Sequence, residues 1–117
     1  MGHTNVKVKI YGPNGSEDVE LLVDTGSTYS WVSKILLDKL GVKPMKPWNF
    51  RTIEGRIVSR QIGEAVIQYD GEKATTVVVF GEEKDAKVLG VYALEGLRLE
   101  VDPLTNKIKK SEALLAI

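Results

Sequence analysis

Alternating hydrophobic and polar positions run through most of the chain, and this is the pattern of strands with one buried face. Val6, Val8 and Ile10 alternate with polar residues, and a second apolar stretch runs over residues 19–23. Between them, residues 13–16 have the sequence Pro-Asn-Gly-Ser, which is typical of a turn. The two stretches therefore predict a hairpin at the start of the chain.

The period of the pattern changes after residue 27. Apolar residues over 32–40 recur at helical spacing and predict a short helix, with Ser33 as its N-cap and Gly41 at its C-terminal end. Pro44 and Pro47 then bracket a segment for which we expect an irregular connection.

Two further hairpins are predicted in the middle of the chain. The first lies over residues 50–59 and has its tip at Gly55. The second joins residues 62–69 to residues 74–80 through Asp-Gly at positions 70 and 71, a strong signal for a tight hairpin turn. The charged segment that follows, residues 81–87, predicts a surface loop.

The last third of the chain is also mostly extended. Residues 88–91 predict a strand that enters a helical turn ending at about Leu97. Leu99 and Val101 alternate again, residues 103–106 predict a turn, and Ile108 lies in a last strand. About six or seven short strands separated by turns predict an all-β fold, closed or sandwiched, with one or two short helices.

Composition places these elements in a single domain over residues 1–117, because domains ordinarily contain about 100–200 residues. The 16 basic and 16 acidic residues cancel, which argues against nucleic acid or an anionic membrane as a partner. No apolar run has the length of a membrane span, and the N-terminus lacks the apolar core of a signal peptide. We therefore expect a cytoplasmic protein.

Few residue types are available for catalysis. The chain contains no cysteine and one histidine, His3, which excludes thiolate chemistry and makes a Ser-His triad or a His-rich metal site implausible. Carboxylates, hydroxyls and lysines remain. We expect neither a metal ion nor another cofactor.

One segment places a carboxylate at the end of an apolar strand: residues 21–27, with the sequence Leu-Leu-Val-Asp-Thr-Gly-Ser. A charged side chain is costly to desolvate there unless it is hydrogen-bonded or functional. Gly26 permits a tight turn and a close approach by another group, while Thr25 and Ser27 supply hydroxyls. On the residues alone, Asp24 either closes an ordinary turn or belongs to a reactive site.

Residues 23–27, Val-Asp-Thr-Gly-Ser, resemble the active-site signature of the aspartic proteases. Matches to the single-domain, retropepsin-like branch follow in the same order: the helix over 33–40, the hairpin around Gly55, and Val-Leu-Gly at 88–90, which is similar to the motif before that family's C-terminal helix. The resemblance spans roughly residues 6–108. It implies an all-β, retropepsin-like closed β barrel (the acid-protease fold).

The resemblance also implies a mechanism and an assembly. The reaction needs two carboxylates and this sequence has one Asp-Thr-Gly, so Asp24 is expected to face Asp24 of a second copy in a homodimer that hydrolyses a peptide or protein substrate. Thr25 is expected to hydrogen-bond across the two-fold axis, and Gly26 to donate its backbone N–H to the carboxylates. Ser27 is expected to donate to the ionised carboxylate, which predicts a more acidic pH optimum than alanine would give there.

Further residues are assigned to the surroundings of Asp24. Three residues at the predicted hairpin tip are expected to form a flap over the substrate cleft: Ile53, Glu54 and Gly55. The charged tip either favours charged or polar substrates or is a solvated turn. Three aromatic residues either line the cleft or belong to the core: Trp31, Trp48 and Phe50.

The C-terminal residues 113–117 are all apolar, although chain ends are usually polar. In this run, Leu114, Leu115 and Ile117 are expected to form the dimer interface together with Thr25, because terminal strands join the dimer sheet in retropepsins. The alternative is packing within one subunit.

Two alternatives from other functional classes use the same residues. Residues 24–30 also resemble the first phosphate loop of actin-like and sugar-kinase ATPases, although that fold needs two domains and here a helical pattern follows the loop. The other alternative keeps the protease fold without its chemistry, as a dimerisation or peptide-binding module.

Overall fold

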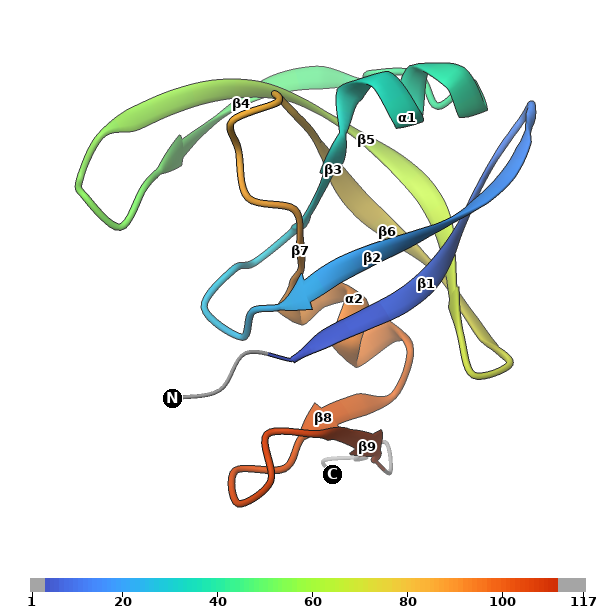
Figure 1. Cartoon of the computed structure of the whole chain (residues 1–117). Coiled ribbons are helices and arrows are strands. Elements are labelled where there is room, and N and C mark those ends of the chain that lie inside the picture. The colour runs from blue at the N-terminus through green and yellow to red at the C-terminus, as the bar shows by residue number, and fades with distance from the viewer. Residues whose placement is uncertain (1–3, 112–117) are drawn as a thin grey trace, which may run out of the picture.

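The structure, a computed structural model, describes residues 4–111 of the chain (Figure 1). Strands make up most of it, and two short helices interrupt them, so the predicted all-β class is confirmed. The elements in chain order are β1 (Asn5–Gly12), β2 (Gly15–Val23), β3 (Ser30–Ser33), α1 (Lys34–Leu40), β4 (Lys46–Arg51), β5 (Ile57–Tyr69), β6 (Glu72–Gly81), β7 (Val88–Leu89), α2 (Val91–Gly96), β8 (Leu99–Val101) and β9 (Ile108–Lys110).

Seven of these strands pair in one sheet, in the order β1-β2-β7-β3-β6-β5-β4. β1 also pairs with β5, where Ile10 lies opposite Ile67. Six strands therefore form a closed ring of hydrogen-bonded neighbours, and β4 extends the sheet beyond β5. The β2–β7 and β3–β6 pairs are parallel, and the other pairs of this sheet are antiparallel. This ring is the closed barrel that the resemblance implied.

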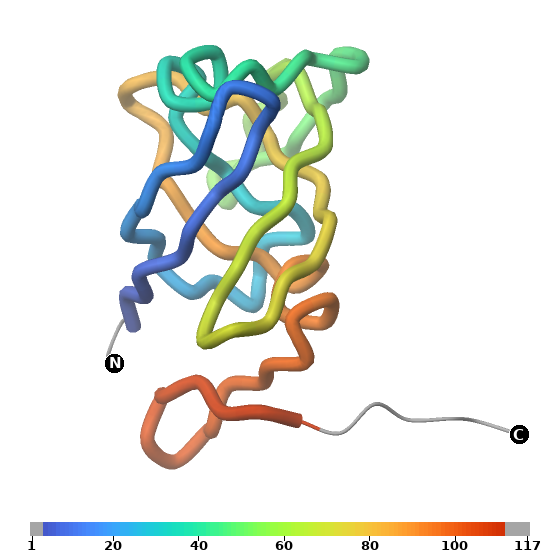
Figure 2. Tube along the Cα trace, turned by 90° about the vertical axis from the view of Figure 1, so that its right-hand side faces the viewer, coloured from blue at the N-terminus to red at the C-terminus, as the bar shows by residue number. Residues whose placement is uncertain are grey.

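The hydrophobic core fills the inside of the ring. Alternate residues of β1 point inward, so Val8 and Ile10 are buried as their alternation predicted. Ile67 from β5, Val78 from β6 and Leu89 from β7 meet them there. The two helices lie at opposite ends of the ring, α1 at the top and α2 at the bottom (Figures 1 and 2), and each buries an apolar side against the core.

Local turn and cap chemistry explains where several elements end. The Ser33 Oγ accepts a hydrogen bond from the Leu36 N–H at 3.4 Å, and Gly41 ends α1 in the left-handed conformation with φ of 80°. Asp70 and Gly71 both have positive φ, 49° and 84°, as a tight two-residue hairpin turn requires. These caps and turns occur at the predicted positions.

Two strands differ from the sequence prediction. β3 occupies residues where we expected only a loop and the start of the helix, because four residues are too few to show a clear alternation. The irregular connection expected between Pro44 and Pro47 is wrong, since β4 already begins at Lys46. Pro47 fits there because β4 lies at the edge of the sheet, where a missing N–H costs no ladder hydrogen bond.

The last described elements, β8 and β9, pair with each other in a separate two-stranded sheet below the ring (Figure 2). The Thr4 hydroxyl donates to the carbonyl of Asn106, which ties the start of the ring to the β8–β9 turn. The Ser111 N–H donates to the carbonyl of Arg98 at 2.8 Å. Neither α1 nor α2, the helices found within residues 4–111, has the length and apolar character needed to cross a bilayer.

The placement of α1 against the core predicts a contrast between two residues of that helix. Leu37 is 0% exposed, whereas Ile35 is 80% exposed. Leu37→Ala leaves a cavity and is expected to lower the free energy of unfolding by about 2–5 kcal/mol, while Ile35→Ala is expected to change it by about 0.5 kcal/mol or less. Urea unfolding followed by circular dichroism measures both, and equal losses would contradict this packing.

Candidate active site

Asp24 begins the loop between β2 and β3, and a backbone group of the same loop orients its carboxylate. The Gly26 N–H donates to Asp24 Oδ1 at 2.9 Å, and the Ser27 N–H donates to the Asp24 main-chain oxygen at 3.2 Å. A Cβ on residue 26 would lie only 3.2 Å from that Oδ1, so glycine allows the close approach. This is the contact that the resemblance implied for Gly26; a role in catalysis stays a prediction.

Strand β7 and the start of α2 hold the loop from both of its ends. The Asp24 N–H donates to the carbonyl of Leu89 at 3.0 Å, and the Val91 N–H donates to the carbonyl of Ser27 at 2.8 Å. The fold thus brings the Val-Leu-Gly segment at 88–90 beside Asp24, although 63 intervening residues separate Asp24 from Val88 in the sequence.

The two segments cross most closely at Gly90. A Cβ there would lie 2.5 Å from the Tyr29 oxygen and 2.7 Å from the Ser27 oxygen, distances that no side chain tolerates. The Gly90 N–H donates to Ser30 Oγ at 3.0 Å, and Ser30 is fully buried. The sequence analysis placed Ser30 only at the end of the alternative phosphate loop and did not predict its contact with Gly90.

The two hydroxyl residues of the signature lie differently. The Ser27 Oγ–H donates to the carbonyl of Tyr29 at 2.8 Å. A hydroxyl has one proton to donate, so in this chain that proton goes to Tyr29 and not to the Asp24 carboxylate, and the more acidic pH optimum stays a prediction. Ser27 braces the loop instead. Thr25 is exposed at the turn of this loop.

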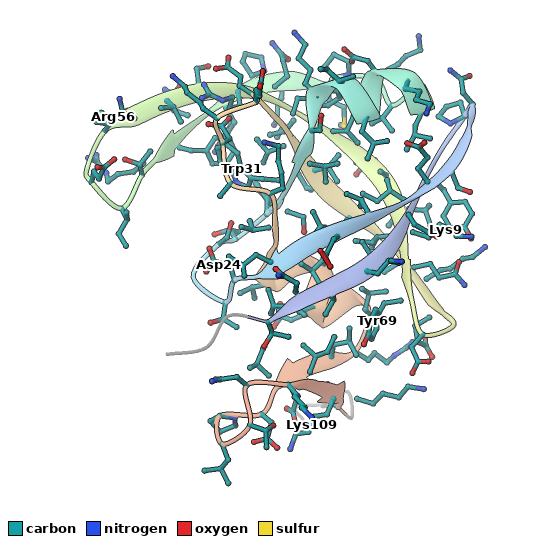
Figure 3. All side chains as sticks on the ribbon, viewed as in Figure 1. Lys9, Asp24, Trp31, Arg56, Tyr69 and Lys109 are labelled. Atoms are coloured by element: carbon teal, nitrogen blue, oxygen red, sulfur yellow. The ribbon has the colours of Figure 1, made fainter. Side chains whose placement is uncertain are left out.

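A cleft of about 1080 Å³ opens beside Asp24. The Asp24 loop forms one side of it, the hairpin of β4 and β5 another, and the loop over residues 82–86 a third. Trp31 lies between Asp24 and that hairpin in the view of Figure 3. Carboxylate, hairpin and loop therefore border one continuous space.

Aromatic side chains form much of the cleft lining. Trp31, Trp48 and Phe50 all line it, and so does Tyr29. The Trp31 and Phe50 rings meet edge to face with centroids 5.0 Å apart, and Trp48 is 51% exposed. Of the two alternatives left open for the three predicted aromatics, the structure favours the cleft over the core.

The predicted hairpin around Gly55 is confirmed, and it is longer than expected. Gly55 has φ of 88°, its N–H donates to the Thr52 carbonyl at 2.9 Å, and the Thr52 N–H donates to the Arg56 carbonyl at 2.8 Å. Ile53 is fully exposed and lines the cleft, whereas Glu54 and Gly55 are not among the lining residues. The function of all three as a flap stays a prediction.

Other predicted site residues cannot be placed. Leu114, Leu115 and Ile117, predicted for the dimer interface, lie outside the described residues. Within residues 4–111, no three His, Cys, Asp or Glu side chains gather in a way that could hold a metal ion.

An ion pair joins the hairpin to the opposite loop across the end of the cleft. Arg60, on β5, binds Asp85 through two contacts, Nε to Oδ2 at 2.8 Å and Nη2 to Oδ1 at 3.1 Å. The two side chains are only 11% and 14% exposed. The Glu82 N–H also donates to Asp85 Oδ2 at 2.8 Å. Sequence analysis missed this pair, because nothing in a sequence connects an arginine with an aspartate 25 residues later.

The pair changes the protonation equilibria of both partners. The hydrogen bond from Arg60, the Glu82 amide and nearby positive charge lower the pKa of Asp85 from its ordinary value, although burial opposes the shift. The hydrogen bond to Asp85 raises the pKa of Arg60. Both groups are therefore charged over a wider pH range than they would be in water.

Comparison with known proteins agrees with this arrangement. A family model described as "Aspartyl protease" matches residues 6–92, which include the Asp24 loop, the hairpin and the 88–90 segment. Among curated proteins, none matches the chain significantly. The family match favours the protease interpretation of the Asp24 loop over the phosphate-loop alternative.

The fold also matches solved structures. A retropepsin-like aspartic protease from Rickettsia conorii aligns with a TM-score of 0.52 at 18% sequence identity, over 87% of this chain and 89% of that chain. At this identity the likeness concerns the fold, and it confirms the retropepsin-like architecture.

The Arg60–Asp85 pair predicts a pH-dependent loss of stability. Asp85→Asn leaves Arg60 without its charged partner and is expected to lower the free energy of unfolding near neutral pH by about 1–3 kcal/mol. Because the folded pKa of Asp85 is lowered, its contribution is complete above the pKa of an unfolded aspartate, about 3.9. The contribution is lost as the pH falls below that value and through the folded pKa.

Urea unfolding of both proteins between about pH 3 and pH 7 measures this difference, which should shrink toward the acidic end. Glu72→Gln is the matched control, because it breaks the exposed Arg98–Glu72 pair, whose side chains are 61% and 41% exposed. We expect the control to lose about 0.5 kcal/mol or less. A loss from Asp85→Asn that stays constant with pH would contradict the assigned cause.

Proposed function

Because the chain belongs to the aspartyl protease family, we propose that it is an aspartic endopeptidase whose catalytic pair consists of Asp24 from each of two identical chains. The observation that carries this proposal is the position of Asp24. Its carboxylate borders a cleft large enough for a peptide segment, and the Gly26 N–H orients one of its oxygens.

The contents of the cleft support the need for a second chain. Besides Asp24, the acidic residues that line it are Glu82 and Asp85, and both form salt bridges with Arg60. Two contacts with the guanidinium favour the ionised form of Asp85, and Glu82 lies 3.5 Å from the same guanidinium. Within residues 4–111 the cleft therefore offers Asp24 no acidic partner, and a two-fold axis that repeats Asp24 supplies one.

The two carboxylates would act as a pair that shares one proton, because like charges about 3 Å apart do not both ionise. The ionised aspartate takes a proton from a water molecule as that water attacks the peptide carbonyl carbon. The protonated aspartate donates its proton to the carbonyl oxygen as negative charge develops there. When the tetrahedral intermediate collapses, the aspartate that took the proton from water gives it to the leaving nitrogen, and the other aspartate takes a proton from a hydroxyl of the intermediate. The C–N bond breaks, and the pair again shares one proton.

Other parts of the cleft would position the substrate. The aromatic wall of Trp31, Trp48 and Phe50 offers apolar surface for peptide side chains. The hairpin tip, with Ile53 exposed toward the cleft, would cover the bound segment and exclude water from the reacting atoms. We assign Thr25 to the contact between the two Asp24 loops, and Leu114, Leu115 and Ile117 to the remainder of the dimer interface.

The first test concerns the catalytic carboxylate. The protein is expected to cleave a denatured protein or an unstructured peptide at about pH 3–6, where a shared proton can be held. Asp24→Asn should lower kcat/KM by about 10²–10⁴-fold or more, because an amide can neither take nor give the proton. Asp38→Asn is the control, since Asp38 is an exposed aspartate on α1 outside the cleft.

Equal cleavage by the wild type and Asp24→Asn would refute the assignment of Asp24. Peptide binding without cleavage by the wild type would favour the non-catalytic module instead.

The second test concerns the sharing of one site by two chains. Mixing wild type with an equal amount of Asp24→Asn and allowing exchange should pair about half of the wild-type chains with an inactive partner. Cleavage per wild-type chain should then fall by about half, and it should fall further with more variant. If each chain carried a complete site, the added variant would leave the activity per wild-type chain unchanged.

A further inference from the structure

Basic side chains line the cleft from the hairpin and from the 82–86 loop. Arg51 ends β4, Arg56 immediately precedes β5, and Lys84 belongs to the loop opposite; all three are exposed and line the cleft. We call these three residues the basic wall. The chain as a whole has a formal net charge of +0, so the positive charge here is local.

Within residues 4–111, the acidic residues that line the cleft form no salt bridge with the basic wall. Glu82 and Asp85 both pair with Arg60. In the part of the chain that the structure describes, no salt bridge involves Arg51, Arg56 or Lys84. Arg51 donates to the carbonyl of Gly55 at 3.3 Å, and that acceptor carries no charge.

The position of the basic wall indicates which part of a substrate it would meet. In Figure 3, Arg56 lies at the far end of the hairpin, and Asp24 lies in its loop below Trp31. A peptide whose scissile bond lies at Asp24 would therefore meet the basic wall with a residue some distance along the chain. Charges that lie away from the scissile bond affect substrate recognition more than the chemical step.

We propose that the basic wall selects substrates that carry an acidic side chain in the segment lying between the hairpin and the 82–86 loop. The proposal rests on the peptide-hydrolase function inferred above, and it names the class of substrate. An anionic group placed there would be attracted by the three cations, which form no salt bridge within residues 4–111, whereas a lysine would be repelled by them. Each contact is exposed, so the selectivity is moderate, about 3- to 30-fold in kcat/KM between an anionic and a neutral residue, or about 0.7–2 kcal/mol at 1.4 kcal/mol per tenfold.

The test uses a set of peptides that differ at one residue, which is glutamine, lysine, glutamate or cysteic acid. That residue is moved through the positions on either side of the cleavage site. The sulfonate of cysteic acid stays ionised at the acidic pH of the assay, whereas glutamate has an ordinary pKa of about 4.3. At one or more positions, cysteic acid should give the highest kcat/KM and lysine the lowest, and glutamate should match cysteic acid only above about pH 4.3.

Charge reversal then tests which residues are responsible. Arg56→Glu combined with Lys84→Glu should reverse the preference, so that the lysine peptide is cleaved better than the cysteic acid peptide. The main hydrogen bonds of the hairpin turn involve the backbone of residue 56, so this exchange leaves them in place. The matched control is Lys34→Glu, since Lys34 is an exposed cation on α1 outside the cleft.

Lys34→Glu also makes the protein more negative, so it controls for the overall positive charge that any protein acquires at acidic pH. It should keep the wild-type preference. Raising the salt from about 0.01 M to about 1 M shortens the Debye length from about 30 Å to about 3 Å, and it should weaken the preference of the wild type.

The outcomes separate this proposal from the proposed function. Cleavage with no dependence on the charge of the peptide, or an equal loss of preference in the Lys34→Glu control, would overturn the proposal and leave the protease assignment intact. A second measurement, the binding of the same peptides to Asp24→Asn by fluorescence anisotropy, tests charge selection without cleavage. If the wild type cleaves none of them but the variant binds the cysteic acid peptide 3- to 30-fold more tightly than the glutamine peptide, charge selection stands and the protease assignment fails. If the variant binds all the peptides equally, or binds none of them, the proposed charge selection is overturned.

Discussion

The close crossing of two backbone segments at Gly90 is the constraint on which the site depends. Asp24 ends a strand, and a carboxylate at a strand end could point in several directions. Hydrogen bonds from and to the β7–α2 segment fix both ends of its loop, and the absence of a Cβ at Gly90 lets the segments approach. Buried Ser30 satisfies the Gly90 N–H from the other side. The carboxylate is therefore positioned by backbone atoms of the barrel and not by flexible side chains.

The same cleft shows how charges are divided between structure and recognition. Arg60 lies within hydrogen-bond distance of Asp85 and within salt-bridge distance of Glu82, so the two acids act as structural partners of one cation. Within residues 4–111, Asp24 and the basic wall form no salt bridge. A single well-buried ion pair thus determines which of the remaining charges can act on a substrate. Which charged side chains of the cleft are available therefore depends on the ion pairs that they form and on their burial. It does not depend on the numbers of acidic and basic residues, which cancel over the whole chain.

What could be predicted from the sequence was local. Gly41, Gly55 and the Asp70-Gly71 turn mark ends and tips because their residue types favour positive φ, and the Asp-Thr-Gly-Ser signature located the loop of Asp24. Interactions between distant segments could not be read in the same way. The Gly90–Ser30 contact joins residues 60 positions apart, and the Arg60–Asp85 pair joins residues 25 apart. The acceptor of the Ser27 hydroxyl was missed although Tyr29 is only two residues away, because the conformation of the loop decides which group a hydroxyl meets.

Strand β5 belongs both to the barrel and to the hairpin over the cleft, and this limits which part of the hairpin can move. Its later residues pair with β1 and β6 inside the ring. At Gly63 the strand passes so close to the Lys43 carbonyl that a Cβ would lie 2.7 Å from it, and at Arg60 the ion pair to Asp85 braces it again. Beyond Arg60 the hairpin is held by its β4–β5 ladder and its own turn, and most of its residues are exposed. Motion that would admit a substrate is therefore confined to the outer hairpin, which carries Phe50, Ile53 and Arg56, while Asp24 and Trp31 stay fixed to the barrel.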